Sequence, residues 1–447
     1  MTGLENFLGD VSNLVWGVPM LALLFGTHLY LTFRLKFIQR YIGTMIKISF
    51  RKDPDATGDI SQFGALATEL AATIGTGNII GVSTAIAAGG PGAVLWMWLT
   101  GVFGMSTKYA QSLLSVKYRV INEDGSISGG PMYVLERALG MKWLGMIFAG
   151  LTAIAAFGIG NMVQSNAIAS MVQENVGISP IITSVVLAIL TGMVILGGIK
   201  SIAKVCEKLI PFMAIFYVLG CIALLYIGYE TIPATLSLIF KSAFSGQAAI
   251  GGFIGVTMRE VVRFGIARGL FSNESGLGSA PIVAAAAQTK NPVRQAMVCS
   301  SGTFWDTIVV CAFTGTVIVN SGEWMNGHEG AALTAAAFSH LAGYGKFILT
   351  VGLLTFAFST ILGWSYYGEK SAEYLFGRRV VKPYRYLWTL VVVMGGVLTM
   401  PVVWSFADIA NALMAIPNLI SVLLLTGVVV ATTKKYLWED NLDAEGD

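Results

Sequence analysis

Residues 75–78 read Gly-Thr-Gly-Asn and interrupt an apolar stretch, residues 62–88, that is long enough to cross a lipid bilayer. Inside a bilayer every backbone N–H and C=O must find a partner, so a helix is broken only where the freed groups line a cavity or bind something. Residues 271–279, which read FSNESGLGS, form a second break of this kind in the other half of the chain. Paired broken helices are typical of the binding site of a secondary transporter. The two breaks therefore predict a transporter for a small polar solute.

The composition predicts an all-α polytopic membrane protein. Of the 447 residues, 55% are hydrophobic and 12% are charged, and the mean hydropathy is +0.71. A soluble chain carries about 25% charged residues. The four cysteines have no metal-ligand spacing, so we expect them to be small buried apolar side chains.

Eleven transmembrane helices are predicted, at about 20 apolar residues per span. They cover residues 13–33, 62–88, 92–117, 143–171, 180–199, 207–228, 255–287, 293–320, 346–376, 384–401 and 403–432. Basic residues crowd alternate loops, and the positive-inside rule then places the N-terminus outside and the C-terminus in the cytoplasm. We expect a multi-pass protein of the cell membrane whose acidic tail after Trp438 is solvated and disordered. Residues 229–254 and 331–341 are predicted to be re-entrant or capping pieces on the outer side.

The placement of the breaks predicts the repeat. Without the first helix ten remain, and the breaks open the first and the sixth of them. Two halves with five helices each have opposite topologies, which makes an inverted repeat. The predicted divisions are 1–60 for the extra helix and a cytoplasmic amphipathic loop, 61–228 for the first repeat, 229–432 for an outer loop and the second repeat, and 433–447 for a cytoplasmic tail.

Several long motifs resemble one family. GGPGAVLWMWLTGVFG at 89–104, GLFSNESGLGSAP at 269–281 and FAFSTILGWSYYGE at 356–369, together with the Gly-Thr-Gly-Asn break, are similar to the alanine or glycine:cation symporter family, which has the LeuT-type fold. The resemblance covers essentially the whole chain. It implies uptake of alanine or glycine driven by a coupling ion, Na⁺ or H⁺, without a prosthetic group. The residues by themselves imply only a small solute.

The chemistry of the first break suits an amino acid. The half-helix that begins near Asn78 presents N–H groups and the positive end of its dipole, which suit a carboxylate. The half-helix that ends near Ile74 leaves free carbonyls that suit a cation or an ammonium group. The alternative is a Gly-x-Gly helix-packing contact. The predicted substrate contacts here are Thr73, Gly75, Thr76, Gly77 and Asn78.

At the second break we expect the Phe271 ring to form one wall of the substrate pocket. We expect the backbone carbonyls of residues 269–272 to accept hydrogen bonds from the amino group of the substrate. Asn273 is a further predicted contact, with capping of the following half-helix as the alternative. Glu274 is polar at mid-membrane, where an unsatisfied group is costly. It holds a proton or a second cation, or it pairs with a base such as Arg268, and we favour the ion pair.

A third element contributes amide side chains. Asn161, Gln164 and Ser165 share one helix face. We predict a substrate contact from Gln164 and, next to it, Asn161, with hydrogen bonding between helices as the alternative. Asp306 is a lone carboxylate within an apolar stretch, and we expect it to neutralise a base such as Arg263.

The cation site follows from the resemblance. LeuT-type proteins hold a cation between carbonyls of the first core helix and adjacent hydroxyls on the eighth. The resemblance implies a sodium site formed by Ala71, Ile74, Phe356, Ser359 and Thr360. Five neutral oxygens suit a hard cation. The alternative is that the two hydroxyls bond only to their own helix.

Other classes of protein have less support. The three histidines do not cluster and no nucleotide loop or zinc spacing is present, so an enzyme is not predicted, and no nucleic-acid partner is expected. A channel also uses broken helices, but it usually repeats short units around an axis. A single chain with five plus five helices favours alternating access, for alanine, glycine or another small polar solute.

Overall fold

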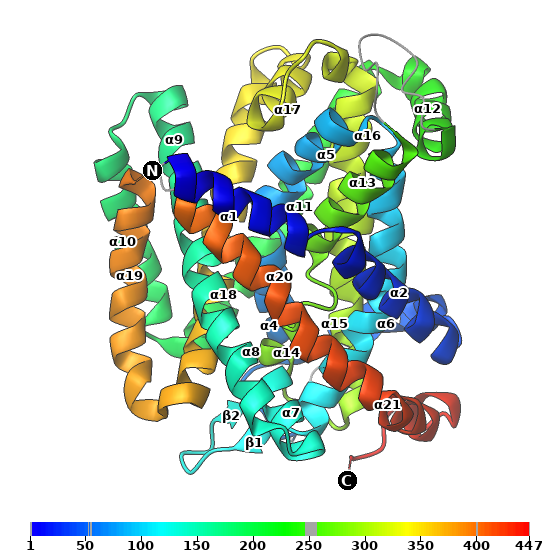
Figure 1. The fold of residues 1–447 in the computed structure, drawn as a ribbon, viewed down its shortest axis with the longest axis vertical. Helices are drawn as coiled ribbons and strands as arrows, with labels where there is room; N and C mark the ends of the chain where they lie inside the picture. Colours follow the sequence, from blue (N-terminus) through cyan, green and yellow to red (C-terminus); the bar gives the residue numbers. More distant parts are fainter. Residues whose placement is uncertain (1, 52, 54–55, 246–256, 399–400, 447) are drawn as a thin grey trace.

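The computed structural model describes residues 2–51, 53, 56–245, 257–398 and 401–446. The described chain is a bundle of helices with one short hairpin, and the two ends of the chain lie at opposite ends of the bundle (Figure 1). Part of the predicted outer segment, residues 246–254, lies outside the described residues. The orientation in the membrane stays a prediction.

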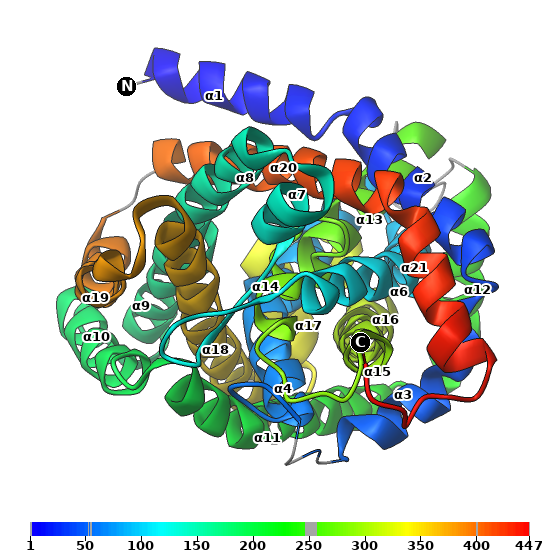
Figure 2. The ribbon, with the colours of Figure 1, turned by 90° about the horizontal axis from the view of Figure 1, so that it is seen from below.

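The predicted first span, residues 13–33, comprises α2 and the end of α1, and the two together give one apolar span from Asn6 to Arg34. A turn at Gly17 separates α1 from α2, and Pro19 lies in the first turn of α2, where its missing N–H has no intrahelical role. Figure 2 shows α1 lying along α20 at the edge of the bundle. The N-terminal elements are α1 (Thr2–Val15), α2 (Val18–Arg34), η1 (Ile38–Tyr41) and α3 (Ile42–Ser49).

The first predicted repeat begins with the broken helix, whose halves meet at an angle of 54°. Its elements are α4 (Gln62–Thr73), η2 (Gly77–Gly81), α5 (Val82–Gly89), α6 (Ala93–Lys117), β1 (Val120–Ile121), β2 (Ile127–Ser128), α7 (Pro131–Leu139), α8 (Lys142–Ala155), η3 (Ala156–Met162), α9 (Val163–Val176), α10 (Pro180–Ile195) and α11 (Gly198–Ile227). The elements α8, η3 and α9 form one continuous helix with a wide π turn in the middle.

The second predicted repeat also opens with a broken helix, α13 and α14. Its elements are η4 (Tyr229–Thr231), α12 (Ile232–Ser245), α13 (Met258–Asn273), α14 (Ala280–Ala284), α15 (Pro292–Thr303), η5 (Phe304–Cys311), α16 (Ala312–Ser321), η6 (Glu323–Met325), α17 (Gly330–Ser339), α18 (Tyr344–Phe376), η7 (Arg378–Val380), α19 (Val381–Val397), α20 (Pro401–Leu424), α21 (Thr426–Thr433) and η8 (Lys434–Trp438). The predicted capping segment 331–341 forms α17, which covers η2 and α5.

Length and composition identify fewer spans than the sequence predicted. Six described helices are long and apolar enough to cross a membrane, or seven with the bent pair α4–α5. The remaining predicted spans correspond to α6, α10, the α13–α14 pair and α19. Of these, α6 is 25 residues long and carries Lys108, a lysine that is buried because other helices pack against α6. The count of eleven stays a prediction.

The prediction of a disordered tail was wrong. Asp443 binds Arg294 at 2.9 Å, and Asn291 donates to the carbonyls of Leu442 and Ala444. The Arg294 side chain is only 2% exposed and also pairs with Asp53 at 3.2 Å. A buried guanidinium needs acceptors for its charge, and the tail supplies one of them.

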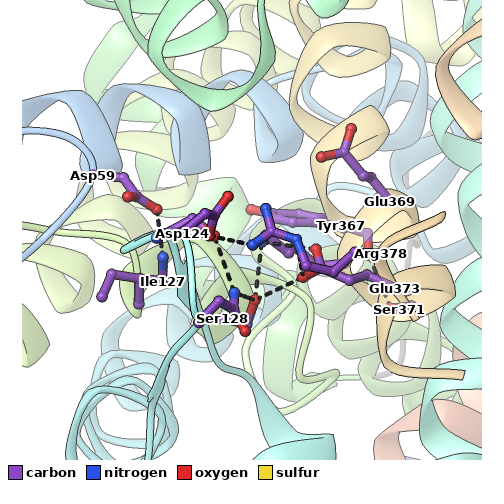
Figure 3. Close-up of polar contacts among 12 residues, drawn as sticks. Asp59, Asp124, Ile127, Ser128, Tyr367, Glu369, Ser371, Glu373 and Arg378 are labelled. Carbon is purple, nitrogen blue, oxygen red and sulfur yellow. Dashed lines mark hydrogen bonds and ion pairs between the residues drawn. The ribbon is translucent and has the colours of Figure 1, made fainter. Parts of the chain in front are cut away.

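A polar network, drawn in Figure 3, lies at the end of the bundle that carries the β1–β2 hairpin. Lys370 on α18 donates to Ser128 of the hairpin and to Glu373, at 3.0 and 2.9 Å. Arg378 binds Asp124 of the same hairpin, and this guanidinium holds the pKa of the Asp124 carboxyl well below its usual range. The network ties the loop after α6 to the end of α18, and it was not predicted from the sequence.

Candidate functional site

The two broken helices meet at a small central cavity. It leaves about 20 Å³ of space, enough for the centre of a water molecule. The walls come from the α4–η2 break, η3 and α9, the end of α13, and the helices α18 and α20. The lining residues are Ala72, Thr73, Gly75, Thr76, Gly77, Ile159, Gln164, Phe271, Glu274, Thr360, Trp364 and Asn411.

At the first break, α4 ends at Thr73 and Ile74 is extended, with φ −76° and ψ 95°. The side chain of Asn78 closes the loop, since its Oδ1 accepts from the Gly75 N–H at 2.9 Å. Its Nδ2 donates to Asp306 at 2.6 Å. The Asn78 side chain is therefore used to hold the break open and does not line the cavity, whereas Gly75 and Gly77 do.

At the second break the backbone reverses through left-handed conformations. Glu274 has φ 55°, and Gly276 and Gly278 follow with φ 91° and 95°, which glycine adopts at little cost. The turn places Glu274 in the cavity lining, and Phe271 in the last turn of α13 lines the same cavity. Asn273 lies outside the lining, and its Oδ1 accepts from the Ser275 N–H at 2.9 Å, which is the capping alternative.

Glu274 is held by neutral donors. Ser279 Oγ lies 2.5 Å from one carboxylate oxygen, and Trp364 Nε1 donates to the other at 3.1 Å. The predicted ion pair with Arg268 was wrong, because the αL turn points Glu274 at the cavity while Arg268 lines a different one. Among the described residues Glu274 has no basic partner within 4 Å.

The predicted pairing of Asp306 with Arg263 was also wrong. Asp306 accepts from Asn78, from Ser272 Oγ at 2.9 Å and from Thr307 at 2.7 Å, so the predicted substrate contact Ser272 also points away from the cavity. Hydrogen bonds from neutral side chains satisfy this carboxylate in the interior.

A buried ion pair near the site was missed from the sequence. Lys108 on α6 lies 3.1 Å from Glu69 on α4, and both side chains are 1% exposed. Its Nζ also donates to the carbonyl of Asn273 at 2.9 Å. One lysine thus joins α4, α6 and the end of α13. The available signal was the presence of charged residues inside two apolar stretches, where they are rare and mark function.

The two amides predicted on one helix face separate in the structure. Gln164 lines the cavity and donates to Thr76 Oγ1 at 3.3 Å and to the Ile159 carbonyl at 3.0 Å. Asn161 donates to the Trp388 carbonyl on α19 at 3.0 Å and lies outside the lining. Asn161 lies in the π turn of η3 and Gln164 lies in the α-helix that follows. The two side chains therefore do not share a face, as residues three apart in an ideal α-helix would.

Five oxygen atoms converge beside the cavity. Ser359 Oγ lies 3.2 Å from the Ala71 carbonyl and 3.5 Å from that of Ile74, and Thr360 Oγ1 lies 3.4 Å from the Ile74 carbonyl. The two hydroxyls lie 2.8 and 3.1 Å from the Phe356 carbonyl. The hydroxyls thus bond to their own helix and also face α4. All five oxygens are neutral and come from buried residues, which suits a hard cation.

Gly75 lies between the oxygen cluster and the cavity. A Cβ added there would lie 2.5 Å from Thr360 Oγ1 and 3.6 Å from Gln164 Oε1. Only glycine lets the end of α4 approach α18 this closely.

Comparisons with known proteins agree with this geometry. The model of the sodium:alanine symporter family matches residues 1–446. The chain is 51% identical to the sodium/alanine symporter AgcS of Methanococcus maripaludis, over 96% of this chain and 97% of that protein. It is 35% identical to the probable sodium/glutamine symporter GlnT of Bacillus subtilis, over 97% and 91%.

A solved structure is similar in fold. The structure of MhsT in complex with L-phenylalanine superposes with a TM-score of 0.56 at 11% identity, covering 85% of this chain and 98% of that one. At this identity the likeness concerns the fold alone, and it confirms the predicted LeuT-type fold. The chain belongs to the sodium:alanine symporter family and is a multi-pass, cation-coupled amino acid symporter, not an enzyme.

Proposed function

We propose that the protein couples inward movement of Na⁺ to uptake of alanine or glycine by alternating access. The observation that carries the proposal is the cluster of five neutral oxygens between α4 and α18, directly beside a small cavity at two helix breaks. A cation there is in contact with the same α4 terminus that bounds the substrate space.

The cavity offers complementary groups to both ends of an amino acid. The N–H groups at the start of η2, at Thr76 and Gly77, suit the carboxylate. Gln164 Oε1 and Asn411 Oδ1 are buried acceptors without a hydrogen-bond partner in the described residues, and both side chains line the cavity. Buried acceptors are normally satisfied, so these oxygens suit the donors of an ammonium group.

The shared terminus of α4 gives a route for coupling. Na⁺ draws the carbonyls of Ala71 and Ile74 toward α18, and the same step fixes Gly75 and Thr76 at the cavity. A cation that raises substrate affinity must have its own affinity raised by the substrate to the same extent.

The test is uptake of radiolabelled alanine into proteoliposomes that contain the purified protein. An inward Na⁺ gradient is expected to drive accumulation, and replacement of Na⁺ by choline is expected to abolish it. Accumulation that follows only a proton gradient would refute Na⁺ coupling. Dissipation of ion gradients without any substrate dependence would instead support a channel.

Substrate size should be limited by the cavity walls. Leucine is expected to inhibit alanine uptake at least about tenfold less well than glycine, since each added methylene must displace Phe271, Ile159 or Trp364 from a packed wall. Phe271→Ala is expected to reduce this difference. Competition assays measure it, and equal inhibition by leucine and glycine in the intact protein would show a wider pocket. Effective competition by glutamine would favour a larger polar substrate.

Glu274 supports a second candidate, in which a proton contributes to the driving force. Glu274 lines the cavity and is 5% exposed, and among the described residues its carboxyl is bonded only by Ser279 and Trp364. If it carries a proton in the cycle, Glu274→Gln is expected to keep Na⁺-driven uptake and to lose any acceleration by an inward proton gradient. Uptake by the variant that still responds to the proton gradient as the parent does would exclude this role.

A further inference from the structure

A second cavity lies on the other side of Phe271 from the central one. It is bounded by α1, α13 and α20, and we call it the α1 cavity. It holds about 160 Å³, against about 20 Å³ for the central cavity. Phe271 lines both, so this one ring separates the two spaces. The α1 cavity is therefore directly next to the substrate space and is the larger of the two.

Three charged side chains line the α1 cavity: Arg263 and Arg268 on α13, and Asp408 on α20. Arg268 on α13 has no hydrogen bond or ion pair within 4 Å among the residues that the structure describes. Asp408 on α20 accepts from Ser12 Oγ at 2.7 Å and is not in ion-pair contact with Arg268, although the two lie close enough to interact electrostatically. A half-buried guanidinium without an acceptor is costly unless something else supplies one.

The helix α1 builds this cavity. Ser12 and Trp16 both bond to Asp408, the latter to its carbonyl at 3.3 Å, and Asn13 accepts from Arg263 at 3.4 Å. These contacts fix the Asp408 side chain in the lining and give Arg263, the second guanidinium of the lining, an acceptor, whereas Arg268 has none among the described residues. The sequence predicted the start of the chain only as an extra span.

We propose that the α1 cavity is a loading site for a zwitterionic α-amino acid, with the carboxylate on Arg268 and the ammonium group on Asp408. The ligand then passes Phe271 into the central cavity. Arg268 and Asp408 offer a partner to each end of a zwitterion, whereas a simple anion would face the Asp408 carboxylate and a simple cation would face the two guanidinium groups. The inference rests on the proposed function in that its ligand is the transported amino acid.

The test places a thiol in the α1 cavity. Ala267 lines it, and the native cysteines Cys206, Cys221, Cys299 and Cys311 are all buried, so Ala267→Cys introduces a single accessible thiol. The purified protein in nanodiscs is labelled with a charged methanethiosulfonate while alanine is titrated. A site that binds alanine slows labelling about threefold at twice its dissociation constant.

The decisive measurement separates the two cavities. In an Ala267→Cys, Gly77→Val background, in which the central cavity is filled, protection by alanine is expected to persist. Adding Arg268→Gln is expected to abolish it, while Arg259→Gln, an exposed arginine of the same helix, is expected to leave it unchanged. Propionate and ethylamine, which each carry one of the two charges, are expected to protect several-fold less than alanine.

Three other results would contradict parts of this proposal. If protection disappears with Gly77→Val while the parent still transports alanine, the ligand binds only centrally and the loading site is refuted, although the proposed function stands. Protection that survives Arg268→Gln, or that propionate matches, refutes the charge pairing. A parent protein that neither transports alanine nor is protected by it refutes the proposed function first.

Discussion

Replacing Ser359 and Thr360 together with alanine is expected to raise the Na⁺ concentration for half-maximal alanine uptake by about tenfold or more, equivalent to about 1.4 kcal/mol. The double variant removes two of the five converging oxygens and leaves the carbonyls of Ala71, Ile74 and Phe356. Because binding of the two ligands is linked, the affinity for alanine at fixed Na⁺ should fall as well. Sodium-dependent alanine binding to the purified variant measures both effects.

Ser365→Ala is the matched control for this experiment. It lies on the same helix and is also buried, and among the residues that the structure describes its hydroxyl bonds only to the Leu362 carbonyl of its own helix, at 2.6 Å. The control is expected to bind Na⁺ as the parent does. Unchanged sodium dependence in the double variant would remove this site from the proposed mechanism.

Gly77→Val is expected to abolish alanine binding while leaving a folded, membrane-inserted protein. An added Cβ would contact the Phe271 ring at 3.4 Å, an ordinary van der Waals distance, so the fold tolerates it. The side chain would nevertheless occupy the substrate space and cover the N–H groups at the start of η2. The prediction is checked by measuring alanine binding to the purified Gly77→Val variant, and its thermal unfolding transition shows whether the variant is folded.

The structure also identifies the right control glycine. Gly81 is buried in the same segment, and a Cβ added there meets nothing within 4 Å, so Gly81→Val should bind alanine nearly normally. Gly101 would be a poor control, because its Cβ would lie 2.8 Å from Thr307. Normal binding by Gly77→Val would show that the carboxylate sits elsewhere.

The sequence predicts where the candidate site lies better than it predicts which side chains line it. Glycines at 75 and 77 and the long motifs locate both breaks, and the adjacent hydroxyls of Ser359 and Thr360 do face α4. These features depend on local backbone requirements that glycine and paired hydroxyls reveal directly.

The direction of individual side chains at a break was not predictable. Once the helix ends, the spacing of residues no longer tells which way they point, so Asn78 and Ser272 turn to Asp306 while Glu274 turns to the cavity. Trp364 and Asn411 were missed because nothing in an apolar helix marks the residue that faces a break on a distant segment.

The lysine shared by three helices restricts which parts of the molecule can move. Pulling α4 away from Lys108 would leave a charge uncompensated in the interior, at about 3–5 kcal/mol, and pulling α13 away would break the hydrogen bond from the charged Lys108 to the Asn273 carbonyl. The segments that contain both breaks are thus expected to travel as one rigid body. Between α4 and α18, by contrast, the oxygen cluster contains only neutral groups. We therefore expect that, in the proposed transport cycle, departure of the cation lets α4 and α18 move past each other at little electrostatic cost.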